Sequence, residues 1–483
     1  MTSILLTCLI FSVNIYPQNV FFDPYTIIPP LGNIKSIAAS TLDIFAVSDN
    51  NLLVFDKNNL SLKRTYVFDS PINLIAYDQW FDDVWITGTN EIIRLSLGSG
   101  ISRQYQINEH INAVGIALDY IYLDAGIKYQ LNRTTGETKL MGTFPNGIKW
   151  YRSTSENDIR KYPMLNPYYY SDDLEESQLP FFQYPVTSLC DDGIILYVGT
   201  QGYGLLRYNK VSWQKERVIY GPLDRRVRKV QKFGDDQYFI SPSGISIYTG
   251  TSGWRYLRML GDISNLVTIG DKLMVSIGNR LSYLSGTMLF PIADFDNSVL
   301  AVSTDGNNIY IGTAYGMFRV LDGSNEPFEF GPDKYPVNAV YVTEKNVYVG
   351  GEVAFYRYEK RTMTWSKVIN RGIKDIVEIN NEFYLLSTDN QLIKYRDGAS
   401  DSLSNDTNWV LLPYFNVYDI DTDHEVLYCA SYAGVAYYDP KDQLYKVMYN
   451  LPRIKFNYVF VADSDLIAVS DQGIYRLPVK YRD

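Results

Sequence analysis

The feature that most constrains the fold of this chain is an internal repeat of roughly forty residues, the period expected of propeller blades. Each copy has a short apolar strand that ends in a small residue, then a turn, then a second strand rich in Tyr or Arg. The clearest copies are residues 196–200 (LYVGT) with 204–208 (GLLRY), 309–313 (IYIGT) with 316–320 (GMFRV), 347–350 (VYVG) with 355–358 (FYRY), and 427–430 (LYCA) with 434–439 (GVAYYD). Weaker copies centre on Phe45, Trp85, Tyr122, Phe239, Met274, Tyr384 and Ile467, which makes eleven in all.

Each repeat also has an apolar strand before it, such as residues 186–189, and a strand after it, such as residues 365–369. Four-stranded sheets arranged radially bury both faces against their neighbours, and the strands nearest the axis need small residues. A sandwich lacks such a period, and the coils of a β-helix are shorter. The sequence therefore predicts an all-β propeller of about eleven four-stranded blades with almost no helix, and its 42 tyrosines favour strands.

Eleven blades exceed the four to eight that one ring usually holds, so we expect two propellers. The last repeat is one strand short, and residues 20–28 form an unattached strand that we expect to complete it and close a ring. The expected division places residues 19–145 and 370–483 in the ring that contains both termini, and residues 186–369 in the second ring. A sequential split near residues 225–260 is the alternative.

Residues 146–185 interrupt the repeat and are expected to form an aromatic insertion or linker that lies against both rings. Its aromatic side chains are the candidate residues for binding a ligand or partner: Tyr168, Tyr169, Tyr170, Phe181 and Phe182. Exposed aromatics beside carboxylates suit a protein hot spot or sugar stacking. The alternative is that the same residues pack between the rings, because a crossing linker needs apolar anchors.

The pattern of an aromatic residue, Gly-Thr, a glycine turn and Leu-x-x-Tyr resembles the two-component-regulator propeller repeat and related YVTN-like bacterial propellers. Residues 196–208 and 309–320 carry the resemblance best, and a weaker match covers most of residues 35–483. The resemblance implies a propeller that lies outside the cytoplasm and binds something. Its motif specifies a blade, and because no kinase or DNA-binding motif accompanies it, signalling is not implied.

Residues 4–15 are mostly apolar and are followed by Tyr16, Pro17 and Gln18, as in the apolar region of a secretory signal peptide. We therefore predict a signal peptide at residues 1–18 and an extracytoplasmic protein: periplasmic, on the cell surface or secreted. The missing basic residue before the apolar run and the missing small-x-small cleavage site count against this prediction. The run is too short to span a bilayer, and we expect no integral membrane segment after it.

Catalytic and metal-binding motifs are not evident in the sequence. His110 and His424 are the only histidines, and there is no Gly-x-Ser-x-Gly, Walker or Rossmann pattern. Residues 419–425 (DIDTDHE) resemble a calcium loop but lack its glycine, so we interpret them as a solvated acidic turn. We therefore expect no catalytic residue, no metal and no cofactor.

Charge argues against nucleic acid as a partner. The formal net charge is −10, and the longest basic run, residues 225–229 (RRVRK), is interpreted as a solvated strand edge. Of three cysteines, Cys190 and Cys429 lie beside strand-like segments and are interpreted as buried thiols, whereas Cys8 lies in the apolar N-terminal run.

These features together predict an exported, non-catalytic module that binds a protein partner or takes part in an assembly. The alternative is a glycan-binding sensor or a carbohydrate-active enzyme, a glycosidase or lyase, with a site at a propeller mouth. Convergent carboxylates in an open cleft would favour the enzyme, and an apolar, uncharged patch would favour the protein partner.

Overall fold

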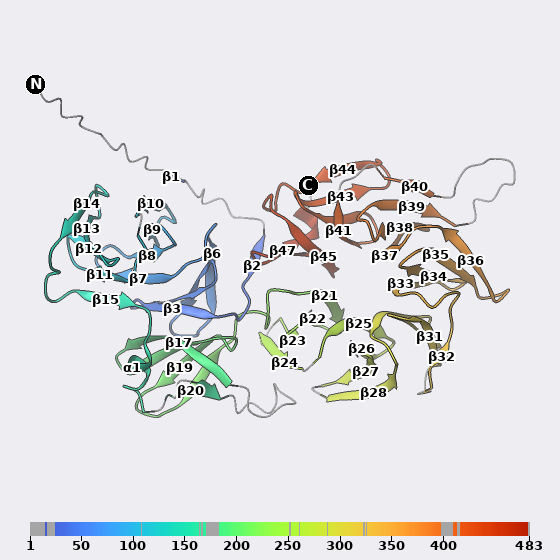
Figure 1. The fold of residues 1–483 in the computed structure, drawn as a ribbon, viewed down its shortest axis with the longest axis horizontal. Helices are drawn as coiled ribbons and strands as arrows, with labels where there is room; N and C mark the ends of the chain where they lie inside the picture. The colour runs from blue at the N-terminus through green and yellow to red at the C-terminus, as the bar shows by residue number, and fades with distance from the viewer. Residues whose placement is uncertain are drawn as a thin grey trace, which may run out of the picture. The chain divides into compact units, whose positions relative to one another are not determined.

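The computed structural model describes residues 15–16, 25–170 and 183–481, apart from gaps at 108, 164, 166–167, 251–252, 260, 287, 322–323, 325, 398–408 and 413–415. These residues form eleven antiparallel sheets, of which eight have four strands and three have five (Figure 1). Helix within the described ranges is limited to α1 (Glu156–Ile159) and the 3-10 turn η1 (Val479–Tyr481). The predicted all-β class and the number of blades are therefore confirmed.

The eleven sheets, numbered here as blades 1 to 11 in chain order, belong to two compact units. Unit 1 contains residues 31–170 and 183–219, and unit 2 contains residues 25–30 and 220–481, among those the structure describes. Within each blade we name the four successive strands A to D. In unit 2, strand A of each blade contacts strand A of the next, so the A strands lie innermost; in unit 1 the same kind of contact joins blade 4 to blade 1, blade 1 to blade 2 and blade 2 to blade 3.

Unit 1 is built of blades 1 to 4. Their strands, in order A to D, are β3 (Ile34–Ala39), β4 (Asp43–Ser48), β5 (Asn51–Asp56) and β6 (Leu62–Val67); β7 (Leu74–Asp78), β8 (Asp83–Thr87), β9 (Glu91–Ser96) and β10 (Ser102–Gln106); β11 (Ala113–Ile116), β12 (Tyr120–Asp124), β13 (Lys128–Asn132) and β14 (Thr138–Met141); β17 (Gln183–Asp192), β18 (Ile195–Thr200), β19 (Leu205–Asn209) and β20 (Lys215–Val218). Fifth strands are added to blades 2, 3 and 4 by β1 (Ile15–Tyr16), β15 (Lys149–Arg152) and β16 (Tyr168–Tyr170).

Unit 2 is built of blades 5 to 11. Their strands, in the same order, are β21 (Lys229–Phe233), β22 (Asp236–Ser241), β23 (Gly244–Tyr248) and β24 (Trp254–Leu257); β25 (Ile263–Ile269), β26 (Lys272–Ile277), β27 (Arg280–Ser285) and β28 (Met288–Asp294); β29 (Val299–Thr304), β30 (Asn308–Thr313), β31 (Gly316–Leu321) and β32 (Phe328–Glu329); β33 (Val337–Val342), β34 (Asn346–Gly351), β35 (Phe355–Glu359) and β36 (Thr364–Ile369); β37 (Ile373–Ile379), β38 (Glu382–Ser387), β39 (Leu392–Arg396) and β40 (Trp409–Leu411); β41 (Val417–Thr422), β42 (Leu427–Ser431), β43 (Gly434–Asp439) and β44 (Leu444–Val447); β45 (Phe456–Ala462), β46 (Asp465–Ser470), β47 (Ile474–Pro478) and β2 (Thr26–Ile28).

The repeat centres identified in the sequence all lie on strand B of their blades, and every one of them is buried. The small residue that follows the centre is required by close packing between blades. A Cβ atom on Gly312 would lie 2.6 Å from the backbone oxygen of Val337 in the next blade, and one on Gly199 would collide with Ser188 and Ile34. Large side chains are excluded there because packed interiors leave no room for added atoms.

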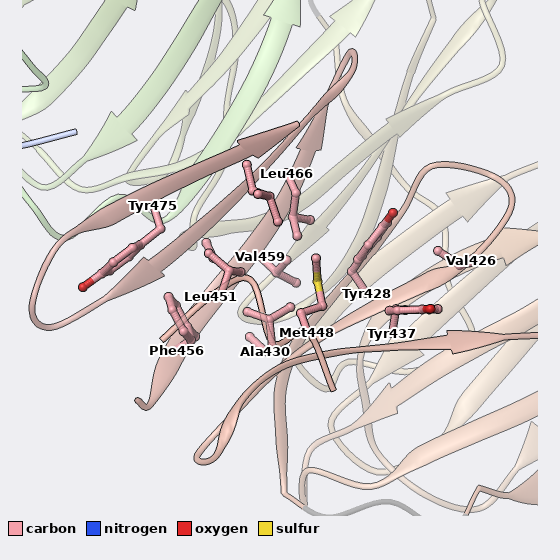
Figure 2. Packing of buried hydrophobic residues seen from close by; sticks show 13 residues of the cluster. Val426, Tyr428, Ala430, Tyr437, Met448, Leu451, Phe456, Val459, Leu466 and Tyr475 are labelled. Atoms are coloured by element: carbon pink, nitrogen blue, oxygen red, sulfur yellow. The ribbon is translucent and has the colours of Figure 1, made fainter. Parts of the chain in front are cut away.

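The ring of unit 2 is closed by β2, which lies in the segment predicted from the sequence to be a strand outside the repeats. β2 pairs antiparallel with β47, with Ile27 opposite Tyr475, and β21 of the first blade contacts β45 of the last. Tyr25 and Ile27 pack against the buried cluster between blades 10 and 11 (Figure 2). The predicted closure is confirmed for residues 26–28, and residues 20–24 lie outside the described ranges.

The division of blades between the units differs from the expected one. Residues 19–145 and 370–483 do not share a ring, because blades 1 to 4 belong to unit 1 and blades 5 to 11 to unit 2. The split near residue 220 is close to the sequential alternative. The physical reason is that a single strand, β2, is enough to complete blade 11, so ring closure needs no further blades from the start of the chain.

Residues 146–185 also differ from the expected linker. β15 pairs with β11, and β16 pairs with β17, so the described parts of this segment extend blades 3 and 4. An unpaired edge strand exposes a row of backbone hydrogen-bonding groups, and these added strands satisfy them. Residues 149–152 and 168–170 therefore extend the blades, whereas the described residues between them contain the short helix α1 and no strand.

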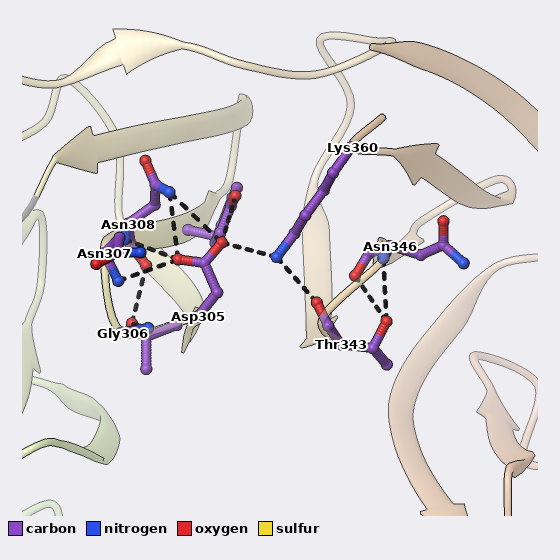
Figure 3. A network of polar contacts seen from close by, with 9 residues as sticks. Asp305, Gly306, Asn307, Asn308, Thr343, Asn346 and Lys360 are labelled. Carbon is purple, nitrogen blue, oxygen red and sulfur yellow. Dashed lines mark hydrogen bonds and ion pairs between the residues drawn. The ribbon is translucent and has the colours of Figure 1, made fainter. Parts of the chain in front are cut away.

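Adjacent blades of unit 2 are also joined by polar contacts at their turns. The Lys360 ammonium donates to Asp305 Oδ2 at 2.7 Å and to the backbone oxygen of Thr343 at 2.9 Å (Figure 3). Asp305 lies on the A–B turn of blade 7 and Lys360 on the C–D turn of blade 8. The contact therefore ties together two sheets that share no backbone ladder.

Candidate functional site

The turns at one end of unit 1 carry the exposed apolar residues that define the candidate site. In an antiparallel blade the A–B and C–D turns lie at the same end of the sheet, and the B–C turn lies at the opposite end. The A–B turns of unit 1 span residues 40–42, 79–82, 117–119 and 193–194. Each of the four carries at least one large apolar side chain that is exposed.

We call this surface the apolar turn face. Exposed fractions of its side chains run from 43% for Ile101 to 75% for Val211. Its A–B turns contribute Leu42, Trp80, Phe81, Leu118 and Ile194, and its C–D turns contribute Ile101, Val211 and Trp213.

Unit 2 shows that exposed apolar turns are not a requirement of the blade. Its seven A–B turns, all of whose residues are described, carry no exposed large apolar side chain. They are built instead from residues such as Gly270-Asp271, Asn380-Asn381 and Asp463-Ser464, which suit tight turns. A turn of this kind therefore does not need an exposed apolar residue, because Gly, Asn and Asp form it in unit 2.

Polar residues hold these turns in a defined conformation. Ser40 Oγ accepts hydrogen bonds from the backbone N–H of Leu42 at 3.1 Å and of Asp43 at 2.9 Å. Asp78 Oδ1 accepts from the N–H of Trp80 at 3.1 Å. Phe81 lies 4.9 Å from the Arg133 guanidinium, measured to its ring centroid. Ordered turns lose little conformational entropy when a partner binds.

Charges near the apolar turn face are paired with each other. Arg133 Nη1 lies 2.6 Å from Asp78 Oδ2, and Lys210 Nζ lies 2.7 Å from Asp191 Oδ1. Lys57 of blade 1 forms an ion pair with Asp192 of blade 4. The three cations are therefore neutralised, and exposed carboxylates such as Asp119 lie on the same turns beside the apolar side chains.

Unit 1 contains a cavity of about 250 Å³ that is lined by the A strands of blades 1, 2 and 4, by β15 of blade 3 and by the segment that follows β15. Lys35, Ile75, Tyr151, Arg152 and Cys190 are among its lining residues. Burial, followed by the charge of Asp192, raises the pKa of the Cys190 thiol to about 12. Since the thiolate is the reactive form, this thiol is not an activated nucleophile at neutral pH.

The A strands of unit 2 surround a larger channel, of about 690 Å³, that contains converging carboxylates. Asp375 lies on β37, and Asp419 and Asp421 lie on β41. Asp419 Oδ2 accepts from the N–H of Val459 at 2.9 Å, and Asp421 Oδ2 accepts from the N–H of Val461 at 2.7 Å. Both carboxylates therefore join β41 to β45, which lies in another sheet.

Burial in the channel favours the neutral form of these acids. Burial, the largest cause, raises the pKa of Asp421 to about 6 and also raises that of Asp375. The pKa of Asp419 lies well above its usual value because of burial and, next, repulsion by Asp375. The interpretation of residues 419–425 as a solvated acidic turn is therefore wrong for these two aspartates. It holds for Asp423, whose Oδ1 accepts from the N–H of Glu425 at 2.9 Å within the turn.

The candidate residues chosen from sequence are described only in part, so their grouping as a binding site stays a prediction. Tyr168, Tyr169 and Tyr170 form β16, of which only the backbone is described, and Phe181 and Phe182 lie outside the described residues. Sequence reasoning missed the apolar turn face. Aligning the eleven repeats at the A–B turn would have pointed to it, because each of the first four copies carries a large apolar residue there, whereas six of the seven later copies carry none.

The described ranges contain neither a group of residues suited to a metal ion nor a helix suited to crossing a membrane. Those ranges contain no group of three or more His, Cys, Asp or Glu residues placed to hold a metal ion. They also contain no helix whose length and apolar character would let it cross a membrane.

Comparison with known proteins gives likenesses in fold only. No protein-family model and no curated protein sequence matches the chain. Among solved structures, the extracellular domain of a one-component system from B. thetaiotaomicron is 12% identical, with a TM-score of 0.45 over 93% of this chain and 70% of that one. The type-IX secretion surface component PorZ from Porphyromonas gingivalis is 11% identical, with a TM-score of 0.37 over 95% and 81%. The designed protein Ika8 is 11% identical, with a TM-score of 0.43 over 62% and 98%.

Proposed function

We propose that this chain is a non-catalytic module that binds a protein partner through the apolar turn face of unit 1. One observation carries the proposal: all four A–B turns of unit 1 expose a large apolar side chain, and none of the seven fully described A–B turns of unit 2 does. Contiguous exposed apolar surface rimmed by polar residues is typical of protein interaction sites.

The composition of the face supports a protein partner over a polyanion. Trp80, Phe81 and Trp213 are of the aromatic types enriched at interface cores, where tryptophan often contributes most of the binding energy. The neighbouring charges form ion pairs with one another, so no excess of cations is left to attract phosphates.

We also propose that the module acts outside the cytoplasm and belongs with the two-component-regulator type of propeller. The first part rests on the apolar residues 4–15, of which residues 4–14 lie outside the described ranges. The second rests on the repeat motif, which the fold places on strands B and C, as β18 with β19 and β30 with β31.

The proposal is tested by site-specific photocrosslinking in the organism that produces the chain. A crosslinking amino acid replaces Trp80, Leu118 or Trp213 in turn, and two apolar positions of unit 2 that are even more exposed, Met363 and Tyr449, serve as controls. We expect adducts of one defined mass from the unit 1 positions and none from the controls. Adducts from both sets alike, or from neither, would contradict the proposal.

A purified partner then allows a quantitative test. Trp80→Ser and Trp213→Ser should each weaken its binding at least ten-fold, since buried interface tryptophans commonly contribute about 2 kcal/mol or more. Met363→Ser should leave the affinity unchanged. An adduct of twice the chain mass, with matching self-association in sedimentation, would identify the partner as a second copy of this chain.

The carboxylates in the channel of unit 2 favour one second candidate, a glycan-binding or carbohydrate-active function at that propeller. An acid with a pKa of about 6, such as Asp421, has the property required of a general acid near neutral pH. The bonds from Val459 and Val461 argue for a structural role instead. Acidic and neutral oligosaccharides can be screened against the wild type and Asp375→Asn to distinguish a carbohydrate site from a structural role of the carboxylates. Only a carbohydrate site should show binding or turnover that Asp375→Asn removes.

A further inference from the structure

The turns that form the apolar turn face carry three cations and three carboxylates, and only the cations are paired. The cations, each in an ion pair with an aspartate at the end of an A strand, are Lys57, Arg133 and Lys210. The carboxylates, all of them exposed, are Asp82, Asp119 and Glu137. Among the described residues none of these carboxylates forms an ion pair, and Asp82 accepts only from the hydroxyl of Tyr77, at 3.0 Å. The exposed cations Arg103 and Lys139 lie on the outer strands β10 and β14, outside the turns.

The buried Arg133 holds the three turns that carry these carboxylates together. Its guanidinium lies 4.9 Å from the ring centroid of Phe81, in the A–B turn of blade 2. Its Nη2 donates to the backbone oxygen of Ala117, in the A–B turn of blade 3. Arg133 itself begins the C–D turn of blade 3. The carboxylates on these three turns therefore form one patch, which we call the acidic rim: Asp82, Asp119 and Glu137.

The positive charge of Arg133 does not neutralise the acidic rim. Arg133 Nη1 lies 2.6 Å from Asp78 Oδ2, and both side chains are almost fully buried. Arg94, which donates to the backbone oxygen of Arg133 at 3.0 Å, forms an ion pair with Asp83. Each guanidinium is therefore matched by an aspartate of its own, and the acidic rim keeps a net negative charge.

The negative charge is confined to one half of the apolar turn face. Asp119 directly follows the exposed Leu118, so the acidic rim borders the apolar side chains of blades 2 and 3. In blade 4 the turn of Trp213 begins with Lys210, which is neutralised by Asp191 at 2.7 Å. The face thus has an acidic half on blades 2 and 3 and a neutral half on blade 4.

We propose that the partner of the apolar turn face is a protein surface on which lysine or arginine side chains lie beside an apolar centre. Its cations contact the acidic rim, and its apolar side chains contact Trp80, Phe81 and Leu118. The inference rests on the proposed function and adds the chemistry of the partner. Complementary charges at the edge of an interface mainly raise the association rate, whereas buried aromatic contacts mainly slow dissociation. The same charge disfavours nucleic acids and anionic membrane surfaces as partners.

Association kinetics test the proposal, with the partner that is captured by photocrosslinking from Trp213, outside the acidic half. Asp119→Asn combined with Glu137→Gln should lower the association rate constant by roughly three-fold or more and leave the dissociation rate constant nearly unchanged. Trp80→Ser should have the reverse effect. Added salt should slow association of the wild type more than that of the neutralised variant. Asp389→Asn, at an exposed turn of unit 2, is the matched control and should change neither rate.

Charge reversal gives a second measurement. Asp119→Lys combined with Glu137→Lys should slow association further, by roughly ten-fold or more. Both positions are exposed and lie on turns, and urea unfolding of each variant checks that the fold is retained.

The outcomes separate this inference from the proposed function. If Trp213 captures no protein, both are wrong. If it captures a protein whose association is unchanged or accelerated by the rim variants, the proposed function stands and this inference is overturned. Capture of lipid, or of a second copy of this chain, would identify a different occupant and would also overturn it.

Discussion

The Arg133 guanidinium forms an ion pair with Asp78 at 2.6 Å that is almost completely shielded from solvent, with side-chain accessibilities of 3% and 0%. Asp78 ends β7 in blade 2, and Arg133 follows β13 in blade 3. Asp78 also accepts from the indole N–H of Trp85 at 3.3 Å and from the N–H of Trp80. One buried pair thus joins two blades and anchors the turn that carries Trp80 and Phe81.

Removing Arg133 should destabilise the chain strongly. Arg133→Met leaves the Asp78 carboxylate buried without its counter-charge, which typically costs roughly 3–5 kcal/mol. Arg361→Met is the matched control, because its pair with Glu359 is long, at 4.0 Å, and the arginine is 89% exposed. Urea unfolding measures both variants, and equal losses would show that the pair is not buried in solution. Adding Asp78→Asn to Arg133→Met should restore part of the loss.

Asp421→Asn should stabilise the chain at neutral pH. Burial raises the folded pKa of Asp421 to about 6, above the ordinary value of an aspartate, so its contribution to stability falls as the pH rises from about 4 to about 6. Asparagine cannot ionise, yet its oxygen can still accept from the N–H of Val461. The free energy of unfolding should rise by on the order of 1–3 kcal/mol at pH 7 and change little at pH 4.

Asp389→Asn, at an exposed turn of the same unit, provides the comparison for Asp421. Its effect should be small and equal at both pH values. If Asp421→Asn raises the free energy of unfolding equally at pH 4 and pH 7, the fold does not keep this acid neutral.

Lys360→Met should loosen the contact between blades 7 and 8. Burial raises the pKa of Asp305, but hydrogen bonds from Lys360 and Asn308 outweigh it and lower the pKa to about 2. A depressed carboxyl pKa contributes stability above about pH 4 that is lost as the pH falls toward 2. We expect Lys360→Met to cost about 1–2 kcal/mol at pH 7 and less at pH 3, measured by urea unfolding. Lys345→Met, an exposed neighbour, should have no effect at either pH.

Ile27→Asp should open the ring of unit 2. Ile27 lies opposite Tyr475 on the closing strand and packs against the cluster between blades 10 and 11 (Figure 2). An unpaired charge there should cost more than roughly 2 kcal/mol. Hydrogen exchange should speed up in β45, β46 and β47 and remain unchanged in unit 1. Thr26→Asp, at the exposed neighbouring position, should leave exchange unchanged, and an effect spread evenly over both units would contradict the local role of β2.

The blade itself could be derived from the sequence. A large apolar centre, aromatic in nine of the eleven copies, marks strand B, because Tyr310 and its equivalents must be buried. A small residue such as Gly312 follows in the clearest copies because it must admit the next blade. The pairing of residues 26–28 with the last blade followed from counting strands. Both inferences rest on interactions that are local or that recur in each blade, and such interactions produce a periodic pattern in the sequence.

The rings and the surfaces were decided by the tertiary structure. Which blades share a ring depends on contacts between A strands that are distant in sequence. The sequence of one blade does not specify which blade lies beside it. Asp419 and Asp421 alternate in the same way as Asp423, yet they line the channel and accept hydrogen bonds from β45, whereas Asp423 bonds within its own turn. The apolar turns of unit 1 become one face only when four sheets present the same end together. Period-two alternation predicts which side chains lie on the same face of a strand. Whether that face contacts water, a channel or another sheet is determined by how the blades pack in the ring.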